Sequence, residues 1–145
     1  MLELVFFHHE AEKMSKCYCG QARSFETCCA PLIRGERIAA TPELLMRSRF
    51  TAYHLGEAAY LLETWHSETR PTELDLSDSP AWQSLRVISS KTKKERGQVK
   101  FRAFYAQASS AESARPLGYL QEESLFLKEA GRWLYHSALS LESSH

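Results

Sequence analysis

All four cysteines of the 145-residue chain lie in one short segment, CYCGQARSFETCC, which spans residues 17–29. A Cys-x-Cys pair is followed by a short loop and an adjacent Cys-Cys pair. Two pairs of thiolates on tight turns can converge on one tetrahedral ion, and zinc favours closed sites of four such ligands. The spacing therefore predicts one structural zinc ion, and a closed site has no open position for catalysis. The predicted ligands are Cys17, Cys19, Cys28 and Cys29.

Disulfide bonds, redox chemistry and free structural thiols are the alternatives for this segment. Adjacent cysteines bridge only with strain, and a reducing compartment disfavours any bridge. A redox relay typically uses Cys-x-x-Cys, which the segment lacks. Metal binding is the interpretation we favour among these.

A second set of residues could line a ligand pocket. Arg49 falls in the middle of the apolar face of a predicted helix, where an unpaired charge is costly to bury. We expect it to pair with Glu122 on a predicted strand. One interpretation is that Arg49 binds an anionic ligand while His66 acts as acid or base. The other, which we favour because no nucleophile or second base is evident, is a buried ion pair. The candidate lining residues are Arg49, Trp65, His66, Glu122, Ser124 and Phe126.

Composition limits the classes of function. The formal net charge is zero, which argues against a mainly electrostatic nucleic-acid binder without excluding a local basic patch. The densest basic run, residues 91–100, is expected at a hairpin tip, as a solvated turn or else as an anionic docking surface. No apolar run reaches the length of a membrane span and no secretory leader is evident, so we expect a cytoplasmic protein. Either Met1 or Met14 could be the natural start.

The elements that position these residues follow from periodicity. Thr41 and Pro42 predict a helix start, and apolar residues at helical spacing continue to residue 55. The period then changes from 3.6 to 2, which predicts strands. Helices followed by consecutive strands indicate an α+β fold, with the helices packed on one face of an antiparallel four-stranded sheet. The remaining predicted elements are a helix at 57–65, a loop at 66–78, a short helical turn at 79–82 carrying Trp82, strands at 85–91, 99–105, 119–129 and 132–138, and connections at 95–98, 109–116 and 130–131.

The cysteine segment resembles the SEC-C motif, in which Cys-x-Cys-Gly precedes a short loop and Cys-Cys. The later part of the chain resembles the bacterial YchJ family. The segments that carry this resemblance are PELLMRSRFTAY, ETWH, ES-x-F and G-x-W-x-Y. This resemblance implies an N-terminal extension (1–13), a SEC-C zinc knuckle (14–40) and a cone-shaped, cystatin-like domain of the nuclear-transport-factor-two-like kind (41–145). Tyr18 and Gln21 replace the usual proline and serine, but every ligand position is kept. The resemblance implies no particular reaction.

Two functions from different classes follow. The favoured one is a non-enzymatic interaction or adaptor module, because SEC-C motifs elsewhere bind zinc and dock onto protein partners. Its docking residues would be Lys16, Tyr18, Arg23 and Phe25. The alternative is a small-molecule-binding or catalytic cone domain that uses the Arg49, His66 and Glu122 pocket. A ligand-sized cavity of about 300 Å³ or more around those residues would favour the alternative.

Overall fold

The structure is a computed structural model that describes residues 16–106 and 117–144. The predicted N-terminal extension (1–13), the choice between Met1 and Met14, and the predicted loop at 109–116 lie outside the described residues.

Four long strands form one antiparallel sheet in the order β1-β2-β3-β4. Their bounds are β1 Ala81–Lys93, β2 Arg96–Ala106, β3 Leu117–Glu129 and β4 Arg132–Ser143. Ala130 and Gly131 connect β3 to β4 with positive φ angles of 54° and 79°, as a two-residue hairpin requires. The predicted meander of four antiparallel strands is confirmed.

Helix α3, Pro42–Leu55, is the central helix of the fold. The Thr41 side chain accepts a hydrogen bond from the Leu44 backbone N–H at 3.1 Å, which caps its first turn. Gly56 ends it in the left-handed conformation, with φ of 80°. A shorter helix, α4, follows at Ala58–Glu63. The start of α3 is therefore where its cap and proline predict.

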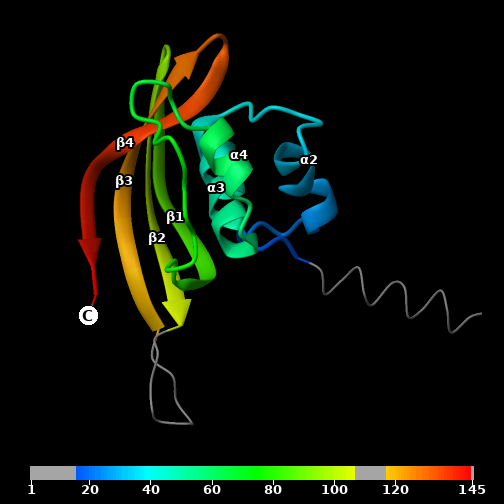
Figure 1. Ribbon diagram of the computed structural model, residues 1–145, viewed down its shortest axis with the longest axis vertical. Coiled ribbons are helices and arrows are strands. Elements are labelled where there is room, and N and C mark those ends of the chain that lie inside the picture. The colour runs from blue at the N-terminus through cyan, green and yellow to red at the C-terminus, as the bar shows by residue number, and fades with distance from the viewer. Residues whose placement is uncertain (1–15, 107–116, 145) are drawn as a thin grey trace, which may run out of the picture.

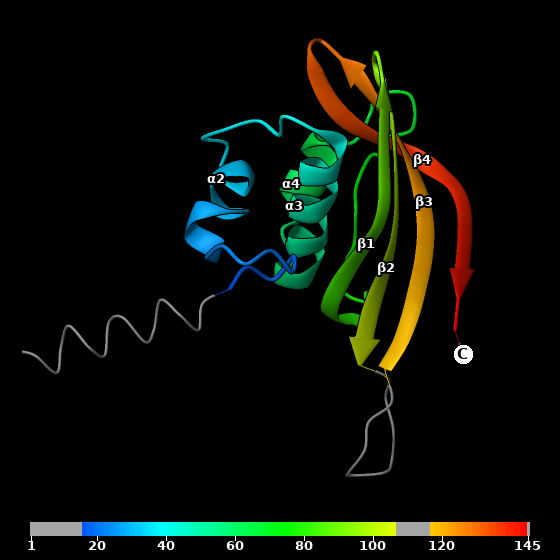
Figure 2. The ribbon, with the colours of Figure 1, turned by 180° about the vertical axis from the view of Figure 1, so that it is seen from behind.

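The molecule has three layers, which Figures 1 and 2 show from opposite sides. The sheet forms one outer layer and α3 with α4 forms the middle. The third layer is the cysteine knuckle, residues 16–40, which contains a 3-10 turn η1 (Phe25–Thr27) and a short helix α2 (Ala30–Ile33). The helices thus lie on one face of the sheet, and the predicted α+β class is confirmed.

Helix α3 is buried because the sheet covers one of its sides and the knuckle covers another. Leu45 and Phe50 belong to the main hydrophobic core together with strand residues such as Val99, as the apolar spacing predicts. Ser48 and Thr51 are also fully buried, although polar residues on a helix usually face solvent. The hydroxyls of Ser48 and of Tyr60 in α4 share a hydrogen bond of 2.7 Å, which satisfies both groups inside the core.

Two local predictions were wrong. The short helical turn at residues 79–82 is absent, and β1 begins at Ala81. Trp82 is held in the sheet opposite Tyr105, with the two rings edge-to-face at 5.5 Å, and its indole N–H donates to Ser79. The turn predicted at 95–98 falls earlier, because Lys94 takes the positive φ of 56° that the hairpin needs.

Candidate functional site

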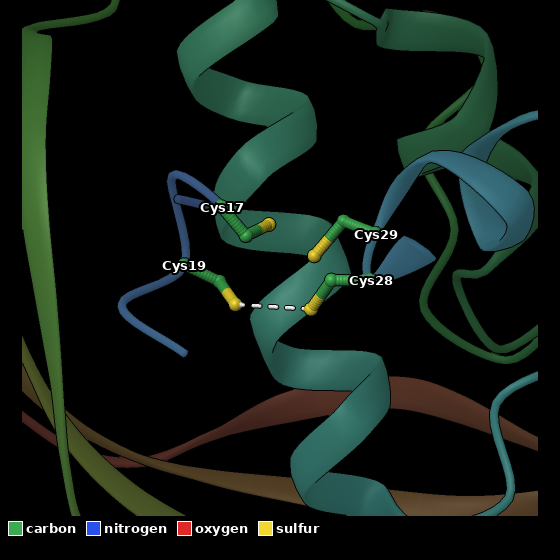
Figure 3. A group of neighbouring side chains, drawn as sticks. All are labelled: Cys17, Cys19, Cys28 and Cys29. Carbon is green, nitrogen blue, oxygen red and sulfur yellow. Dashed lines mark hydrogen bonds between the residues drawn. The ribbon is translucent and has the colours of Figure 1, made fainter. Parts of the chain in front are cut away.

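The four cysteine side chains converge in the knuckle and point toward one another (Figure 3). Their sulfur atoms all lie within 4.8 Å of one another, and Cys19 Sγ is 3.7 Å from Cys28 Sγ. Four thiolates around a tetrahedral zinc ion at about 2.3 Å are about 3.8 Å apart. The donor set and its spacing therefore fit a tetrahedral metal ion, and these residues could hold one.

Backbone turns bring the two cysteine pairs together. Gly20 adopts φ of 97° and donates its N–H to the Cys17 carbonyl at 3.1 Å, which closes the first turn. The Cys17 N–H donates to Arg23 O at 2.8 Å. Cys28 follows η1 and Cys29 precedes α2, so the second pair lies between two short helical turns.

Helix α3 supports the cluster from behind with two polar side chains. The Thr51 hydroxyl donates to Cys29 Sγ at 3.4 Å, and Arg47 donates to the Cys19 carbonyl at 2.7 Å. Arg47 is itself held by Glu43 at 3.0 Å, one helical turn earlier. Sequence reasoning missed both supporting residues, because nothing in a helical pattern indicates which polar side chain faces a neighbouring layer.

The cysteines are part of the main core. They are between 0% and 8% exposed and belong to the same hydrophobic cluster as Leu45, Phe50 and Val99. Burial is the largest cause that raises the pKa of the Cys28 thiol, to about 12, and the neighbouring sulfurs add to it. The pKa of Cys29 is raised too, and the largest cause is the hydrogen bond of its thiol to the Cys17 sulfur. Close, buried thiolates repel one another, and a cation removes that repulsion.

A cavity of about 270 Å³ lies between α3 and the sheet. Its walls are mainly apolar, with polar groups from α3 and from strands β3 and β4. Arg49, Glu122, Ser124 and Phe126 line it, as do Tyr53 and Tyr135, which sequence reasoning did not include. Trp65 and His66, which were predicted from the sequence to line the same pocket, do not line this cavity.

The predicted pairing of Arg49 with Glu122 is corrected by the structure. Arg49 donates from Nη1 to the Leu61 carbonyl at 2.8 Å and to the Thr64 hydroxyl at 2.7 Å. Its guanidinium lies over the rings of Trp65 and Tyr135, at 5.1 and 4.7 Å. Carbonyl dipoles and aromatic faces replace the carboxylate as its partners. Burial lowers the pKa of Arg49.

Glu122 makes its own contacts on the opposite wall of the cavity. It accepts hydrogen bonds from the Ser124 hydroxyl at 2.6 Å and the Tyr135 hydroxyl at 3.2 Å. Burial raises the pKa of Glu122, an effect that these hydrogen bonds oppose. Burial likewise raises the pKa of Tyr53. The cavity thus presents one cation and one carboxyl group without a direct ion pair between them.

His66 follows Trp65 directly, where the chain leaves α4. It is 8% exposed, and its backbone N–H donates to Tyr135 O at 2.7 Å. Its imidazole faces His136 of β4, with ring centres 5.3 Å apart, rather than Arg49. The structure therefore separates the histidine from the arginine that sequence reasoning joined to it.

The predicted docking residues lie on and near the first turn of the knuckle, where the Tyr18 ring also packs against His54 of α3 at 4.6 Å. Tyr18 is 42% exposed and packs edge-to-face on the half-buried Phe25 at 5.4 Å. Lys16 and Arg23 are exposed on the same turn. In residues 16–106 and 117–144, none of the helices combines the length and apolar character that a membrane span needs.

Comparisons with known proteins agree with this architecture. The family described as "YchJ, middle NTF2-like domain" matches residues 41–138. A UPF0225 protein of Deinococcus radiodurans is 41% identical over 122 residues, covering 84% of this chain and 87% of that protein. A UPF0225 protein of Streptomyces coelicolor is 38% identical over 122 residues, covering 82% and 90%.

Two solved structures share the fold. A SEC-C motif containing protein from Rhodopseudomonas palustris gives a TM-score of 0.76 at 33% identity, covering 88% of this chain and 99% of that one. A SEC-C motif containing protein from Psychrobacter arcticus gives a TM-score of 0.67, covering 93% and 87%, and at 21% identity this likeness concerns the fold alone.

The fold and the site together define a class of protein. Its members join an NTF2-like domain of sheet and helices to a four-cysteine centre of the SEC-C type. The chain belongs to the YchJ family. Its relatives in Deinococcus, Streptomyces and other genera are bacterial UPF0225 proteins, so the family predicted from the sequence is confirmed.

Proposed function

We propose that the chain is a zinc-binding, non-enzymatic interaction protein. The single observation that supports this most is the burial of four convergent thiols, which leaves a bound ion no position for water. Zinc at such a site organises the surrounding turns. We keep as part of the proposal the division into an extension (1–13), a knuckle (14–40) and a cone domain (41–145).

The docking surface of this proposal is the exposed part of the first turn of the knuckle, next to His54 of α3. Tyr18 offers a large, partly exposed ring with a polar tip, which is a frequent anchor at protein interfaces. Lys16 and Arg23 flank it with positive charge, while the nearby carboxylate of Glu26 is paired with Arg34 at 2.8 Å. This charge favours a partner that presents acidic groups around an apolar pocket.

An affinity purification from a bacterial lysate of the native host tests the proposal. Lys16→Ala/Tyr18→Ala removes the basic and aromatic groups of the knuckle. Arg86→Ala/Ile88→Ala is a matched control, because both side chains are exposed on β1. We expect one protein that wild type and control retain and that the knuckle variant loses, while all three hold one zinc ion. Equal retention by all three proteins would place docking elsewhere.

The cavity supports a second candidate function, binding of a small organic ligand. Arg49 and Glu122 face it without a direct ion pair, which is the observation that favours a ligand. Its volume of about 270 Å³ is slightly below the value of about 300 Å³ that the sequence-based prediction set for a ligand-binding cavity. Such a ligand would combine an apolar body with an anionic group. Native mass spectrometry tests this: a bound metabolite should be present in wild type and lost in Ala103→Leu, which fills the cavity. Identical spectra would argue against it.

A further inference from the structure

A cluster of imidazole and carboxylate groups lies outside both sites described above. His66 and Glu68 come from the chain segment after α4, and His136 comes from β4. One ligand atom from each of the three residues lies within 4.8 Å of the others. Two imidazoles and a carboxylate are donors that zinc, copper, nickel and iron accept.

Backbone hydrogen bonds fix the two histidines relative to each other. The Tyr135 N–H donates to Thr64 O at 2.9 Å, and the His66 N–H donates back to Tyr135 O at 2.7 Å. The Thr69 hydroxyl donates to His136 O at 2.7 Å. The segment from 64 to 69 is thus attached along the edge strand β4, and the donors are held by regular backbone structure rather than by a free loop.

The hydrogen bonds of His136 orient its outer nitrogen toward Glu68. Its Nδ1 lies 2.8 Å from the Ser137 hydroxyl, and its Nε2 lies 2.9 Å from Glu68 Oε1. With a proton on Nδ1 directed at Ser137, Nε2 is free to bind a metal ion. The ion would then occupy the space of the proton now shared between His136 and Glu68.

His66 would bind the ion through Nδ1, and metal binding would replace the hydrogen bond that this nitrogen now accepts. Its Nδ1 accepts the Glu68 backbone N–H at 3.1 Å and lies 4.0 Å from Glu68 Oε1. The proton is therefore on Nε2, which lies 4.0 Å from Glu129 Oε1, too far for a hydrogen bond until the Glu129 side chain moves closer. Glu129 is itself held by the backbone N–H of Ser67 at 3.2 Å and by its hydroxyl. A carboxylate behind a ligand histidine is the common way to orient a metal-binding imidazole.

We propose that His66, Glu68 and His136 form a second, exchangeable site for a divalent transition-metal ion such as zinc. Three protein ligands leave a position for water or a small ligand, in contrast to the closed cysteine centre. Metal–nitrogen and metal–oxygen distances of about 2.0–2.1 Å place the donors about 3.3 Å apart. Glu68 Oε1 would therefore move away from His136 Nε2, now at 2.9 Å, and toward His66 Nδ1, now at 4.0 Å. Glu68, whose side chain is 67% exposed, can make that movement.

Titration of the zinc-loaded protein with Co²⁺ tests the site. Cobalt bound by histidine and carboxylate gives visible d–d absorption without thiolate charge transfer, so it is distinguished from cobalt that has entered the cysteine centre. Every protein in the titration carries His8→Ala/His9→Ala. This change removes two neighbouring histidines that could bind Co²⁺ by themselves. The protein is loaded with one equivalent of zinc, which the cysteine centre takes. We expect one equivalent of Co²⁺ to bind while that zinc ion is retained.

Variants of the ligands decide the assignment. We expect His136→Ala and Glu68→Gln each to weaken Co²⁺ binding at least about tenfold, and Glu129→Gln to weaken it about tenfold through the orientation of His66. Glu73→Gln is the matched control, since Glu73 is exposed in the following segment. No d–d absorption in the parent protein, or equal affinity in the ligand variants and the control, would overturn the proposal.

Discussion

The contact between Thr51 and the cysteine centre gives a sharp test of how α3 supports metal binding. Thr51→Val keeps the shape of the buried side chain and removes its hydroxyl. A hydrogen bond to a charged group contributes about 1.5–3 kcal/mol. The Thr51 hydroxyl has one proton, directed at both Cys29 Sγ (3.4 Å) and Arg47 O (3.2 Å), so we expect the lower part of this range. A loss of about 1.5–2 kcal/mol corresponds to zinc binding weakened about 13- to 30-fold.

Competition with a chromophoric zinc chelator at pH 7 measures this change. Thr51→Ser is the control, because it keeps the hydroxyl and removes only the methyl group, and we expect it to bind zinc nearly as wild type does. Circular dichroism of the zinc-loaded proteins checks that the fold is unchanged. If Thr51→Val bound zinc as tightly as wild type, or if Thr51→Ser lost as much affinity, the hydroxyl would not support the thiolate.

Three further predictions concern stability and protons. Gly97→Ala should destabilise the fold by about 1–3 kcal/mol in urea unfolding, because its Cβ would lie 2.9 Å from Pro42 Cβ; an unchanged midpoint would contradict that packing. Burial raises the pKa of Glu122, so its neutral form stabilises the fold at low pH and that contribution is lost as pH rises through the raised pKa. Glu122→Gln should therefore raise Tm at pH 7 but not at pH 4, and an equal difference at both would refute this. Thiols lose protons when they bind metal, so zinc uptake at pH 7 should release protons to an indicator dye, and zero release would argue against thiolate ligands.

The order of elements could be predicted from the sequence because each carries its own local signal. Thr41-Pro42 marks the start of α3, and Gly56 marks its end. Trp82 shows where local signals fail. Ser79-Pro80 resembles a helix start, but the indole gains more by packing against Tyr105 and Phe50 across the layers, so the segment is extended.

The candidate sites were predictable to different degrees. Cysteine spacing indicated that the four thiols converge and could hold a metal ion, because residues close in sequence are brought together by local turns. The environment of Arg49 was not predictable, since its partners are the Leu61 carbonyl and two aromatic faces, and backbone carbonyls carry no sequence signal. The proximity of His66 and His136 depends on the attachment of residues 64–69 to β4, which no periodicity reports.

The position of the cysteine centre has a consequence for biosynthesis. Its contacts with α3 join Cys19 to Arg47 and Cys29 to Thr51, and all four residues precede the first strand at Ala81. A nascent chain leaves the ribosome from its N-terminus, so the knuckle and its supporting helix emerge before strands β1 to β4. We expect metal capture to begin during translation, and the emerging strands then to assemble on a helix whose opposite side is already covered.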